Sequence, residues 1–204
     1  MIVIIDYGMG NLRSINKAFE RLNIKALISS KKEDIDNADK LILPGVGHFS
    51  NGMKNLNNLN IIELLQNKIT IDKVPILGIC LGLQLFTNFS EEGNVAGLGL
   101  IDGKTVRFDF AGRDNNLKVP HMGWNTVEIK KENKLLDSIN NDELFYFVHS
   151  YHITCNDKKD VLTTTTYGYE FASAVQKDNI YWTQFHPEKS HSAGLKMLLN
   201  FSRS

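Results

Sequence analysis

The sequence predicts an α/β protein in which a doubly wound, mostly parallel sheet is flanked by helices. Residues 2–5 form a near-continuous apolar run, which is typical of a parallel strand buried on both faces. The apolar residues that follow recur at helical spacing, at Leu12, Ile15, Phe19 and Leu22. Because strand and helix patterns alternate along the chain, we expect βαβ units, and such sheets carry their chemistry at the carboxyl ends of the strands.

The remaining elements of the first half continue this alternation. Residues 25–29 and 40–43 are short segments that we expect to form the second and third strands. A helix is predicted from the spacing of Leu56, Leu59, Ile62 and Leu65. Residues 75–79 form the next buried strand, which leads into a glycine-containing segment and then into a further apolar helical pattern.

The second half of the sequence has a different pattern. Its segments are typical of strands with turns between them, at residues 106–108, 126–129, 145–148, 162–166 and 172–175. We expect part of this region to pair in antiparallel fashion, as an additional portion beside the parallel sheet. A closing helix is predicted from the spacing of Leu195, Leu198, Leu199 and Phe201.

Length and charge limit the classes of function. The chain has 204 residues, which we interpret as a single domain spanning residues 1–204. Its 23 Lys and Arg balance 23 Asp and Glu, so the formal net charge is zero and no basic surface for nucleic acid or an anionic membrane is expected. No apolar run approaches membrane length, and the two cysteines lack the spacing of a disulfide framework or a zinc site. We therefore expect a cytoplasmic protein.

Cys80 is a candidate nucleophile because of the segment in which it lies. It stands in Gly78-Ile79-Cys80-Leu81-Gly82, between the strand at residues 75–79 and the following helical pattern. The flanking glycines permit a tight turn at this point. At the N-terminus of a helix the thiolate is favoured, and the thiolate is the nucleophilic form of cysteine. The alternative is a structural cysteine, since free cysteines are commonly buried.

A second candidate group lies near the C-terminus, in Gln184-Phe185-His186-Pro187-Glu188. On an extended segment His186 and Glu188 would face the same side, and Pro187 favours the end of a strand. A carboxylate beside a histidine fixes its tautomer and its orientation. Alone, such a pair is typical of a protein surface, but together with Cys80 it predicts a Cys-His-Glu triad.

Three partial motifs carry no functional prediction. Gly8-Met9-Gly10 begins like a dinucleotide-binding fingerprint, but Arg13 stands where the third glycine is required. Gly103-Lys104-Thr105 lacks the earlier glycine of a P-loop. His149 and His152 would point to opposite faces of one strand, so we predict core or interface histidines rather than a metal site.

Six segments together resemble the class I, or triad, glutamine amidotransferases, and among them the glutaminase subunits of imidazole glycerol phosphate synthase. The cysteine segment and His-Pro-Glu are common to all class I glutaminases. Pro-Gly-Val-Gly and Pro-His-Met-Gly-Trp-Asn are typical of the narrower group. The resemblance covers almost the whole chain, at residues 6–12, 43–47, 78–84, 120–125, 147–151 and 184–190.

This resemblance implies the class I glutamine amidotransferase fold and glutamine hydrolysis, with no cofactor and no metal. The catalytic residues that it implies are Cys80, His186 and Glu188. The oxyanion hole that it implies is formed by the backbone at Val46, Gly47 and Leu81. The substrate-binding residues that it implies are Gly45, Gln84, Glu92, His149, Ser150 and Tyr151, with Glu91 as an alternative to Glu92.

The resemblance also implies a heterodimer with a HisF-type (β/α)8 cyclase, which uses the ammonia in histidine biosynthesis. Candidate interface positions are Trp124, Tyr146 and Lys189. Because glycines flank the oxyanion loop, we expect it to hold its N–H donor turned away until the partner binds. Departures from the family pattern at residues 181–182 and at His191 leave open a paralogous glutaminase that supplies a different synthase, such as a sugar amidotransferase. A non-enzymatic binding module is the further alternative if the triad is not assembled.

Overall fold

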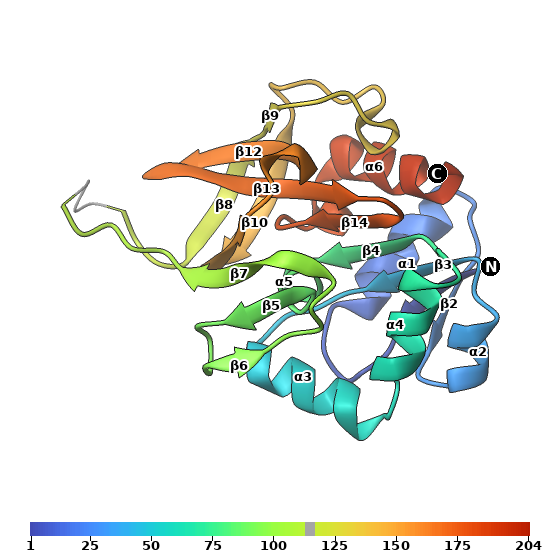
Figure 1. Cartoon of the computed structure of the whole chain (residues 1–204). Helices are drawn as coiled ribbons and strands as arrows, with labels where there is room; N and C mark the ends of the chain where they lie inside the picture. The colour runs from blue at the N-terminus through green and yellow to red at the C-terminus, as the bar shows by residue number, and fades with distance from the viewer. Residues whose placement is uncertain (113–116) are drawn as a thin grey trace.

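The computed structural model describes residues 1–112 and 117–204, and in this part of the chain eight strands form a central sheet (Figure 1). In spatial order the strands are β2 (Ala26–Ser29), β1 (Ile2–Ile5), β3 (Lys40–Leu43), β4 (Ile76–Ile79), β14 (Ile180–Thr183), β13 (Tyr169–Lys177), β12 (Val161–Tyr167) and β9 (Glu128–Ile129). The first five strands of this order pair in parallel, and the last three pair in antiparallel fashion. The predicted doubly wound, mostly parallel sheet with an antiparallel portion is confirmed.

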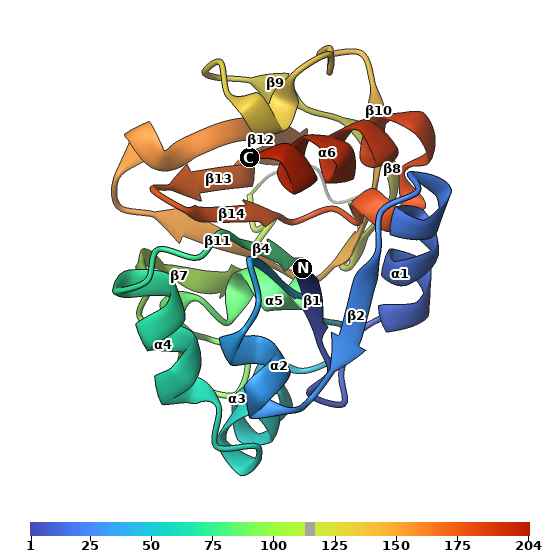
Figure 2. The ribbon, with the colours of Figure 1, turned by 90° about the vertical axis from the view of Figure 1, so that its right-hand side faces the viewer.

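Helices cover both faces of the parallel part of the sheet (Figure 2). One face carries α1 (Leu12–Arg21) and α6 (His191–Arg203), which pack against Ile2 and Ile4 of β1. The other face carries α2 (Lys32–Asp36), α3 (Phe49–Asn58) and α4 (Ile62–Thr70), which pack against Val3 and Ile5. Since successive residues of a strand point to opposite faces, a strand between two helical layers must be apolar throughout, as β1 is.

The helix predicted around residues 56–65 is wrong in one respect, because it is two helices. Helix α3 ends at Asn58 and α4 begins at Ile62, with Asn60 between them at a φ of +52°. Asparagine adopts this left-handed conformation more readily than most residues. The apolar spacing continues across the break because Leu56, Ile61 and Leu65 are all buried in the same core.

Two smaller sheets lie beyond the carboxyl ends of the central strands (Figure 1). The four-stranded sheet has the order β11 (Tyr151–Cys155), β7 (Ile101–Arg107), β5 (Thr87–Ser90) and β6 (Val95–Ala96). The two-stranded sheet pairs β10 (Leu144–His149) with β8 (His121–Thr126). The strand predicted at residues 106–108 begins earlier, at Ile101, and ends at Arg107. The one predicted at residues 126–129 divides between the end of β8 and β9.

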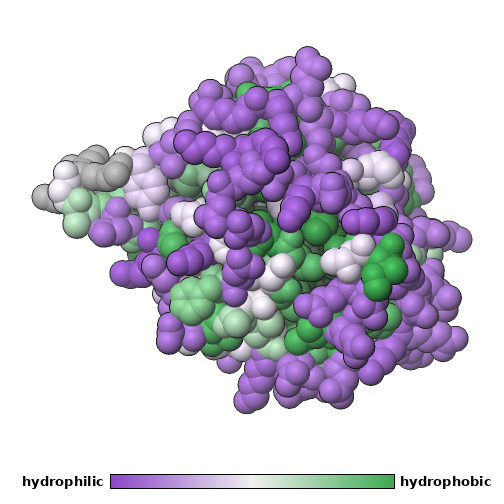
Figure 3. All heavy atoms as spheres, in the orientation of Figure 1, coloured by the Kyte–Doolittle hydropathy of each residue, from purple (hydrophilic) through white to green (hydrophobic). Residues whose placement is uncertain are grey.

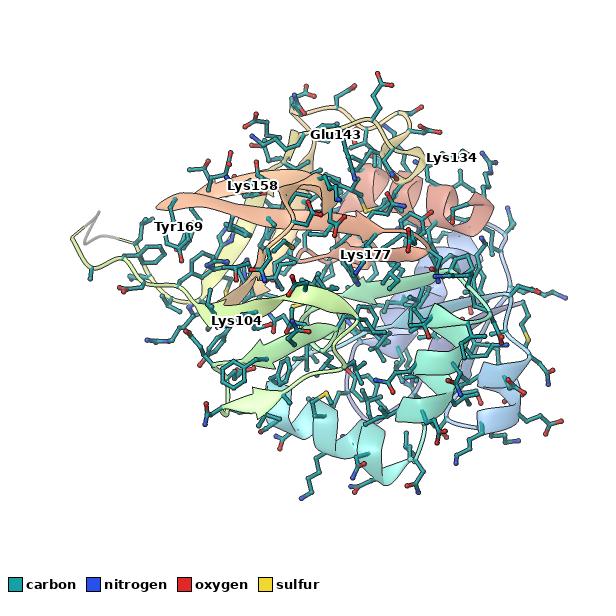
Figure 4. All side chains as sticks on the ribbon, in the orientation of Figure 1. Lys104, Lys134, Glu143, Lys158, Tyr169 and Lys177 are labelled. Carbon is teal, nitrogen blue, oxygen red and sulfur yellow. The ribbon has the colours of Figure 1, made fainter. Side chains whose placement is uncertain are left out.

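The face shown in Figure 3 is mostly hydrophilic, and its hydrophobic residues gather over β5, β6 and α4. Near the top of the same view Glu143 lies close to α6 (Figure 4), where its Oε1 contacts Nζ of Lys196 at 2.5 Å. Within residues 1–112 and 117–204, no helix has the length and apolar character needed to cross a membrane.

Candidate active site

Cys80 lies at the junction of β4 and the short helix α5 (Leu81–Gln84), with backbone angles φ +52° and ψ −107°. This conformation is strained for a residue with a side chain, and such strain is typical of a nucleophile elbow. The turn also passes very close to β3, because a Cβ added at Gly82 would lie 1.8 Å from the carbonyl oxygen of Leu43. Only glycine fits there, and the N–H of Cys80 is fixed by a 2.8 Å hydrogen bond to Thr183 O.

The helix after Cys80 is shorter than the sequence pattern predicts. It has four residues, and the chain turns at Leu85 and Phe86 into strand β5. Leu85 and Phe86 are fully buried, which explains the apolar pattern without a longer helix. A single helical turn provides few aligned dipoles, so the groups around the sulfur contribute more to its electrostatics than α5 does.

His186 and Glu188 are in contact, with Nδ1 of His186 2.8 Å from Oε1 of Glu188. They do not share an extended strand, which corrects the expectation from their spacing. Strand β14 ends at Thr183, and Pro187–Lys189 forms a 3₁₀ turn that folds the carboxylate back onto the imidazole. Proline at the start of such a turn loses no required hydrogen bond.

The His186–Glu188 pair is deeply buried, with side-chain exposures of 2% and 1%. Burial disfavours the imidazolium, but the charge and hydrogen-bonding capacity of the Cys80 sulfur and of Glu188 outweigh it, and the pKa of His186 rises to about 10. Nε2 of His186 makes no regular hydrogen bond to any described residue. The sulfur therefore acts on this nitrogen mainly through its charge, which favours the protonated form of the His186 ring.

The loop after β3 presents a carbonyl group, rather than an N–H group, to the elbow. The backbone N–H of Leu81 donates a 3.3 Å hydrogen bond to the carbonyl oxygen of Gly45. The preceding peptide is held by Tyr7, whose hydroxyl donates to Pro44 O at 2.6 Å. Burial, and then the charge of Cys80, raises the pKa of Tyr7 above its ordinary value, so this hydroxyl keeps its proton and remains a donor.

Cys80 opens into a cavity of about 360 Å³, within the size range of small-molecule sites. Nine of the residues singled out in the sequence line it: Val46, Gly47, Cys80, Leu81, Gln84, Glu92, His149, Ser150 and Tyr151. Pro120 and Val148 also line it, although no role was predicted for either residue. Gly45, His186 and Glu188 are outside this lining.

The two neighbouring glutamates differ in position. Oε2 of Glu92 accepts a 2.8 Å hydrogen bond from the N–H of Phe49, at the start of α3, and Glu92 lines the cavity. Oε2 of Glu91 instead accepts from the N–H of Arg107 at 2.8 Å, and Glu91 is not part of the lining. Only Glu92 of this pair therefore faces the space in which a ligand of Cys80 would lie.

His149 and His152 are buried, as expected of core histidines. The expectation that they share one strand is wrong, because His149 ends β10 and His152 lies on β11. Nδ1 of His149 contacts Tyr151 O at 2.8 Å, and its Nε2 lies 3.0 Å from Nδ1 of His121. Nε2 of His152 contacts the hydroxyl of Tyr169 at 2.8 Å, on the β12–β13 hairpin (Figure 4). No three His, Cys, Asp or Glu side chains of the described residues come together as a metal site.

The three candidate interface residues form one cluster with His191. The rings of Trp124 and His191 stack 4.7 Å apart at an interplanar angle of 4°. Tyr146 meets Trp124 edge to face at 5.7 Å, and Nζ of Lys189 lies 5.4 Å from the centre of the Tyr146 ring. Trp124 is 43% exposed, so this aromatic cluster is part of the surface rather than of the core.

Gln184 is a polar contact of the sulfur that sequence reasoning missed. Its side-chain nitrogen lies 3.7 Å from Sγ of Cys80, and the residue is fully buried. A signal was available, because Gln184 directly follows the segment that we identify as β14, the parallel neighbour of the strand leading to Cys80. Tyr7 and His121 also lay in family-like segments without being given a role.

Comparison with known proteins places the chain in a family. The sequence pattern described as "Glutamine amidotransferase class-I" matches residues 3–203. A Methanococcus maripaludis protein named imidazole glycerol phosphate synthase subunit HisH 2 is 53% identical over 201 residues, with 98% of each chain covered. Subunit HisH 1 of Campylobacter jejuni is 50% identical over 204 residues, with both chains fully covered. Subunit HisH 2 of Pseudomonas aeruginosa is 46% identical over 201 residues, with 98% of each chain covered.

Solved structures agree on the fold. A structure described as PurLQS from Thermotoga maritima superimposes with a TM-score of 0.74 at 17% identity, covering 99% of this chain and 96% of that one. A second, described as a glutamine amidotransferase, has a TM-score of 0.72 at 18% identity and covers 98% of both chains. From the sequence pattern and the close relatives together, the chain belongs to the class I glutamine amidotransferase family, in its HisH branch.

Proposed function

We propose that this chain hydrolyses glutamine to glutamate and ammonia, with Cys80 as nucleophile, His186 as its acid–base partner and Glu188 as the group that orients His186. The observation that carries the proposal is the 2.8 Å contact between Nδ1 of His186 and Oε1 of Glu188. This contact leaves Nε2 as the ring nitrogen available to the sulfur. The strained elbow and the adjoining cavity supply the nucleophile and the space for its substrate.

The reaction starts when the Cys80 thiolate attacks the side-chain amide carbon of glutamine. A C–S bond forms, and the carbonyl oxygen takes the negative charge. The imidazolium of His186 then gives its proton to the amide nitrogen as the C–N bond breaks, which releases ammonia. Water attacks the resulting thioester and gives a proton back to His186, and the sulfur leaves as glutamate forms. The raised pKa of His186 keeps this proton available until the C–N bond breaks.

The oxyanion requires N–H donors, which we assign to Leu81 and to Val46, next to Gly47. In the present arrangement the carbonyl of Gly45 occupies the N–H of Leu81. That carbonyl and the N–H of Val46 belong to one peptide unit, so a rotation of this unit would replace the acceptor by a donor. We therefore expect the isolated chain to be a slow glutaminase.

The substrate amino acid is expected to bind in the cavity beside Cys80. We assign its contacts to Gln84, Glu92 and the segment His149-Ser150-Tyr151, all of which line this space. Glu92 is a carboxylate, which suits the α-ammonium group of glutamine. Gly45 contributes through the loop conformation rather than through a surface of the cavity.

The ammonia is used by a second subunit, and we propose a HisF-type (β/α)8 cyclase as the heterodimer partner. Relatives that are about half identical to the chain are named subunits of imidazole glycerol phosphate synthase. The pair would convert an N1-(phosphoribulosyl)formimino aminoimidazole carboxamide nucleotide into imidazole glycerol phosphate and aminoimidazole carboxamide ribonucleotide, in cytoplasmic histidine biosynthesis. We place the docking surface on the exposed face of β8 and β10, where Met122, Trp124 and Leu144 are 62%, 43% and 50% exposed.

A second candidate function is ammonia supply to a different synthase, such as a sugar amidotransferase. One observation favours keeping it. Methanococcus maripaludis has two proteins of this name, HisH 1 and HisH 2, which are 48% and 53% identical to the chain. Two copies in one organism leave one of them free to serve another acceptor. The His191–Trp124 stack belongs to the proposed docking surface. A chain that binds a different synthase is expected to differ from its relatives at this surface.

The two candidates are separated by adding each partner to the purified chain. Glutamate formation is measured for the chain alone, with the HisF-type cyclase of the same genome and its nucleotide, and with a candidate sugar synthase and its sugar. The first candidate predicts that the cyclase with its nucleotide stimulates glutamate formation and that the sugar synthase does not. If the sugar synthase with its sugar stimulates glutamate formation and the cyclase does not, the second candidate function is supported. Absence of glutamine hydrolysis under all three conditions would contradict both candidates.

A further inference from the structure

The sulfur of Cys80 has two neutral polar contacts among the described residues. Nε2 of the Gln184 side chain lies 3.7 Å from Sγ, and the carbonyl oxygen of Val148 lies 4.0 Å from it. The carbonyl can only accept a hydrogen bond, so it suits a protonated thiol. An amide N–H can donate to a thiolate. The nearer of the two contacts is therefore the one that favours the reactive form of the sulfur.

The orientation of the Gln184 amide follows from its neighbours. Nε2 of Gln84 lies 2.9 Å from Tyr151 O, and a carbonyl oxygen accepts only, so this end of Gln84 is its NH2 group. The same nitrogen lies 3.4 Å from Oε1 of Gln184. Because a donor faces that position, it must be the oxygen of Gln184, and the NH2 group of Gln184 then faces the sulfur.

We propose that Gln184 is a further catalytic residue, whose side-chain N–H donates a hydrogen bond to the Cys80 thiolate before attack and again when the sulfur leaves. This inference rests on the proposed function, since it assigns a role relative to the same nucleophile. Gln84 then acts as a positioning residue for Gln184, in addition to lining the cavity. The resulting chain of hydrogen bonds runs from Sγ of Cys80 through Gln184 and Gln84 to the carbonyl of Tyr151.

The hydrogen bond matters at two points of the reaction. Before attack, the sulfur carries the negative charge, and the donor stabilises it inside a buried site. During the thioester stage the sulfur is neutral and the hydrogen bond is weak. When water has added to the thioester carbon, the C–S bond breaks and its electron pair returns to sulfur. A donor already in place at that moment assists departure of the thiolate, since better-stabilised thiolates leave faster.

Packing alone does not account for this residue. Gln184 is fully buried, and an unbranched apolar side chain of similar length, such as methionine, would fill the same space. Its backbone is held separately, by a 2.9 Å hydrogen bond from its N–H to Ser173 O. A purely structural role for the amide therefore predicts that methionine leaves the chemistry of the sulfur unchanged.

The test measures alkylation of Cys80 by iodoacetamide as a function of pH, with the modified peptide quantified by mass spectrometry. This readout needs neither glutamine nor a partner, and it separates Cys80 from Cys155, whose pKa burial and then Asp160 and Asp157 raise to about 12. Four proteins are compared: the unmodified chain, Gln184→Met, Gln84→Met and Thr183→Val. Thr183 is the matched control, because it is equally buried and its hydroxyl bonds Phe185 O at 3.0 Å instead of the sulfur.

Gln184→Met is expected to move the midpoint of the pH profile upward by about one pH unit or more, as for loss of a hydrogen bond to a charged group. The plateau rate at high pH should not fall, because a less stabilised thiolate is at least as nucleophilic. Gln84→Met should give a smaller shift in the same direction, and it carries the test if Gln184→Met does not fold. Thr183→Val should keep the original midpoint.

An unchanged midpoint in the folded Gln184→Met protein would overturn the inference, as would a uniform loss of rate at every pH. Either result would leave the proposed function intact, provided that the unmodified chain shows a titrating Cys80. If Cys80 of the unmodified chain does not react at any pH of the series, the nucleophile assignment itself fails.

Discussion

The backbone N–H of Leu81 donates a hydrogen bond to the carbonyl oxygen of Gly45 across 3.3 Å. In the proposed reaction this N–H must instead face the developing oxyanion, and the negative end of the Gly45 carbonyl dipole now lies beside it. Removal of one oxyanion donor costs about 2.7–4 kcal/mol in enzymes where it has been tested. An arrangement that replaces a donor with an acceptor is therefore sufficient to keep hydrolysis slow.

Substitution of Gly45 cannot test by itself whether the Gly45 carbonyl slows hydrolysis. A Cβ at Gly45 would lie 2.7 Å from the backbone nitrogen of Gly82 and 2.7 Å from Tyr7 Oη. The clash would displace the elbow along with the loop, so loss of activity would not distinguish the two. Tyr7 offers a better point of intervention, because it acts on the loop through one hydrogen bond.

We expect Tyr7→Phe to raise the rate of glutamine hydrolysis by the chain without a partner, by about twofold to tenfold. The Tyr7 hydroxyl holds Pro44 O at 2.6 Å, and losing one such hydrogen bond shifts a conformational equilibrium by roughly that factor. The measurement is glutamate formation by the purified variant. Tyr167→Phe is the matched control, since it removes a tyrosine hydroxyl bonded to Lys118 O at 2.7 Å. A rate equal to or below that of the unmodified chain would argue that Tyr7 does not restrain the loop.

His186→Asn is expected to be nearly as damaging as loss of Cys80, whereas Glu188→Gln is expected to be milder. The reason is that His186 transfers the proton and Glu188 only orients it, and members of a triad act as a unit. The measurement is the partner-stimulated rate of ammonia release, supported by the rate at which a glutamine-like electrophile labels Cys80. Equal labelling of His186→Asn and the unmodified chain would show that His186 does not activate this sulfur.

The stability of the fold should depend on pH through buried neutral histidines. Burial lowers the pKa of His121 from 6.5 to about 4. Between these values the unfolded chain binds more protons than the folded one, so stability falls as the pH decreases from 6.5 to 4, by up to about 1.4 kcal/mol per pH unit for one group. His149 and His152, whose pKa values burial also lowers, contribute with the same sign.

His121→Phe should therefore make the free energy of unfolding less dependent on pH. Phenylalanine can keep the ring contacts with Phe147 and Tyr167, which lie 4.8 and 4.1 Å from His121, but it cannot take up a proton. Urea unfolding at pH 7 and pH 5 measures the difference. The variant loses a hydrogen bond to His149, so its absolute stability is lower and the slope is the informative quantity. If the free energy of unfolding changes equally between pH 7 and pH 5 in the two proteins, His121 is not a source of the pH dependence.

The central parallel strands could be predicted because each is buried between two helical layers and reads as an apolar run, as in Ile2–Ile5. In the smaller sheets, the strand predicted at residues 145–148 is confirmed as β10 and the one at 106–108 overlaps the end of β7, whereas β6 and most of β8 were not predicted. Strand β6 has two residues, and β8 contains Gly123 and Asn125, so neither carries a clear periodic pattern. The break between α3 and α4 was missed because the apolar spacing is continuous across Asn60.

For the candidate site, spacing pointed to residues that the structure brings together, but it did not predict their geometry. His186 and Glu188 meet through a 3₁₀ turn rather than along a strand, because Pro187 starts that turn. The direction of the Gly45 carbonyl has no signature in the sequence, since glycine accepts either orientation of the peptide. Gln184 was missed because its role depends on contacts with Gln84 and Cys80, which lie 100 and 104 positions away.

Trp124→Ala is expected to weaken binding of the proposed cyclase partner by tenfold or more, because a large exposed aromatic near the centre of an interface commonly dominates its affinity. Titration of the immobilised partner measures the dissociation constant. Ile71→Ala is the control, since Ile71 is 71% exposed and follows α4, at the amino-terminal end of β4. If both variants bind as tightly as the unmodified chain, the partner does not use the face of β8 and β10.

The most direct test of the central claim is glutamate formation from glutamine by the chain bound to the proposed cyclase partner and its nucleotide, compared with the Cys80→Ala variant in the same complex. The triad assignment predicts a loss of several powers of ten in the variant, with its fold and its affinity for the partner unchanged. Near-normal glutamate formation by a folded, partner-bound Cys80→Ala protein would contradict the assignment of Cys80 as the nucleophile.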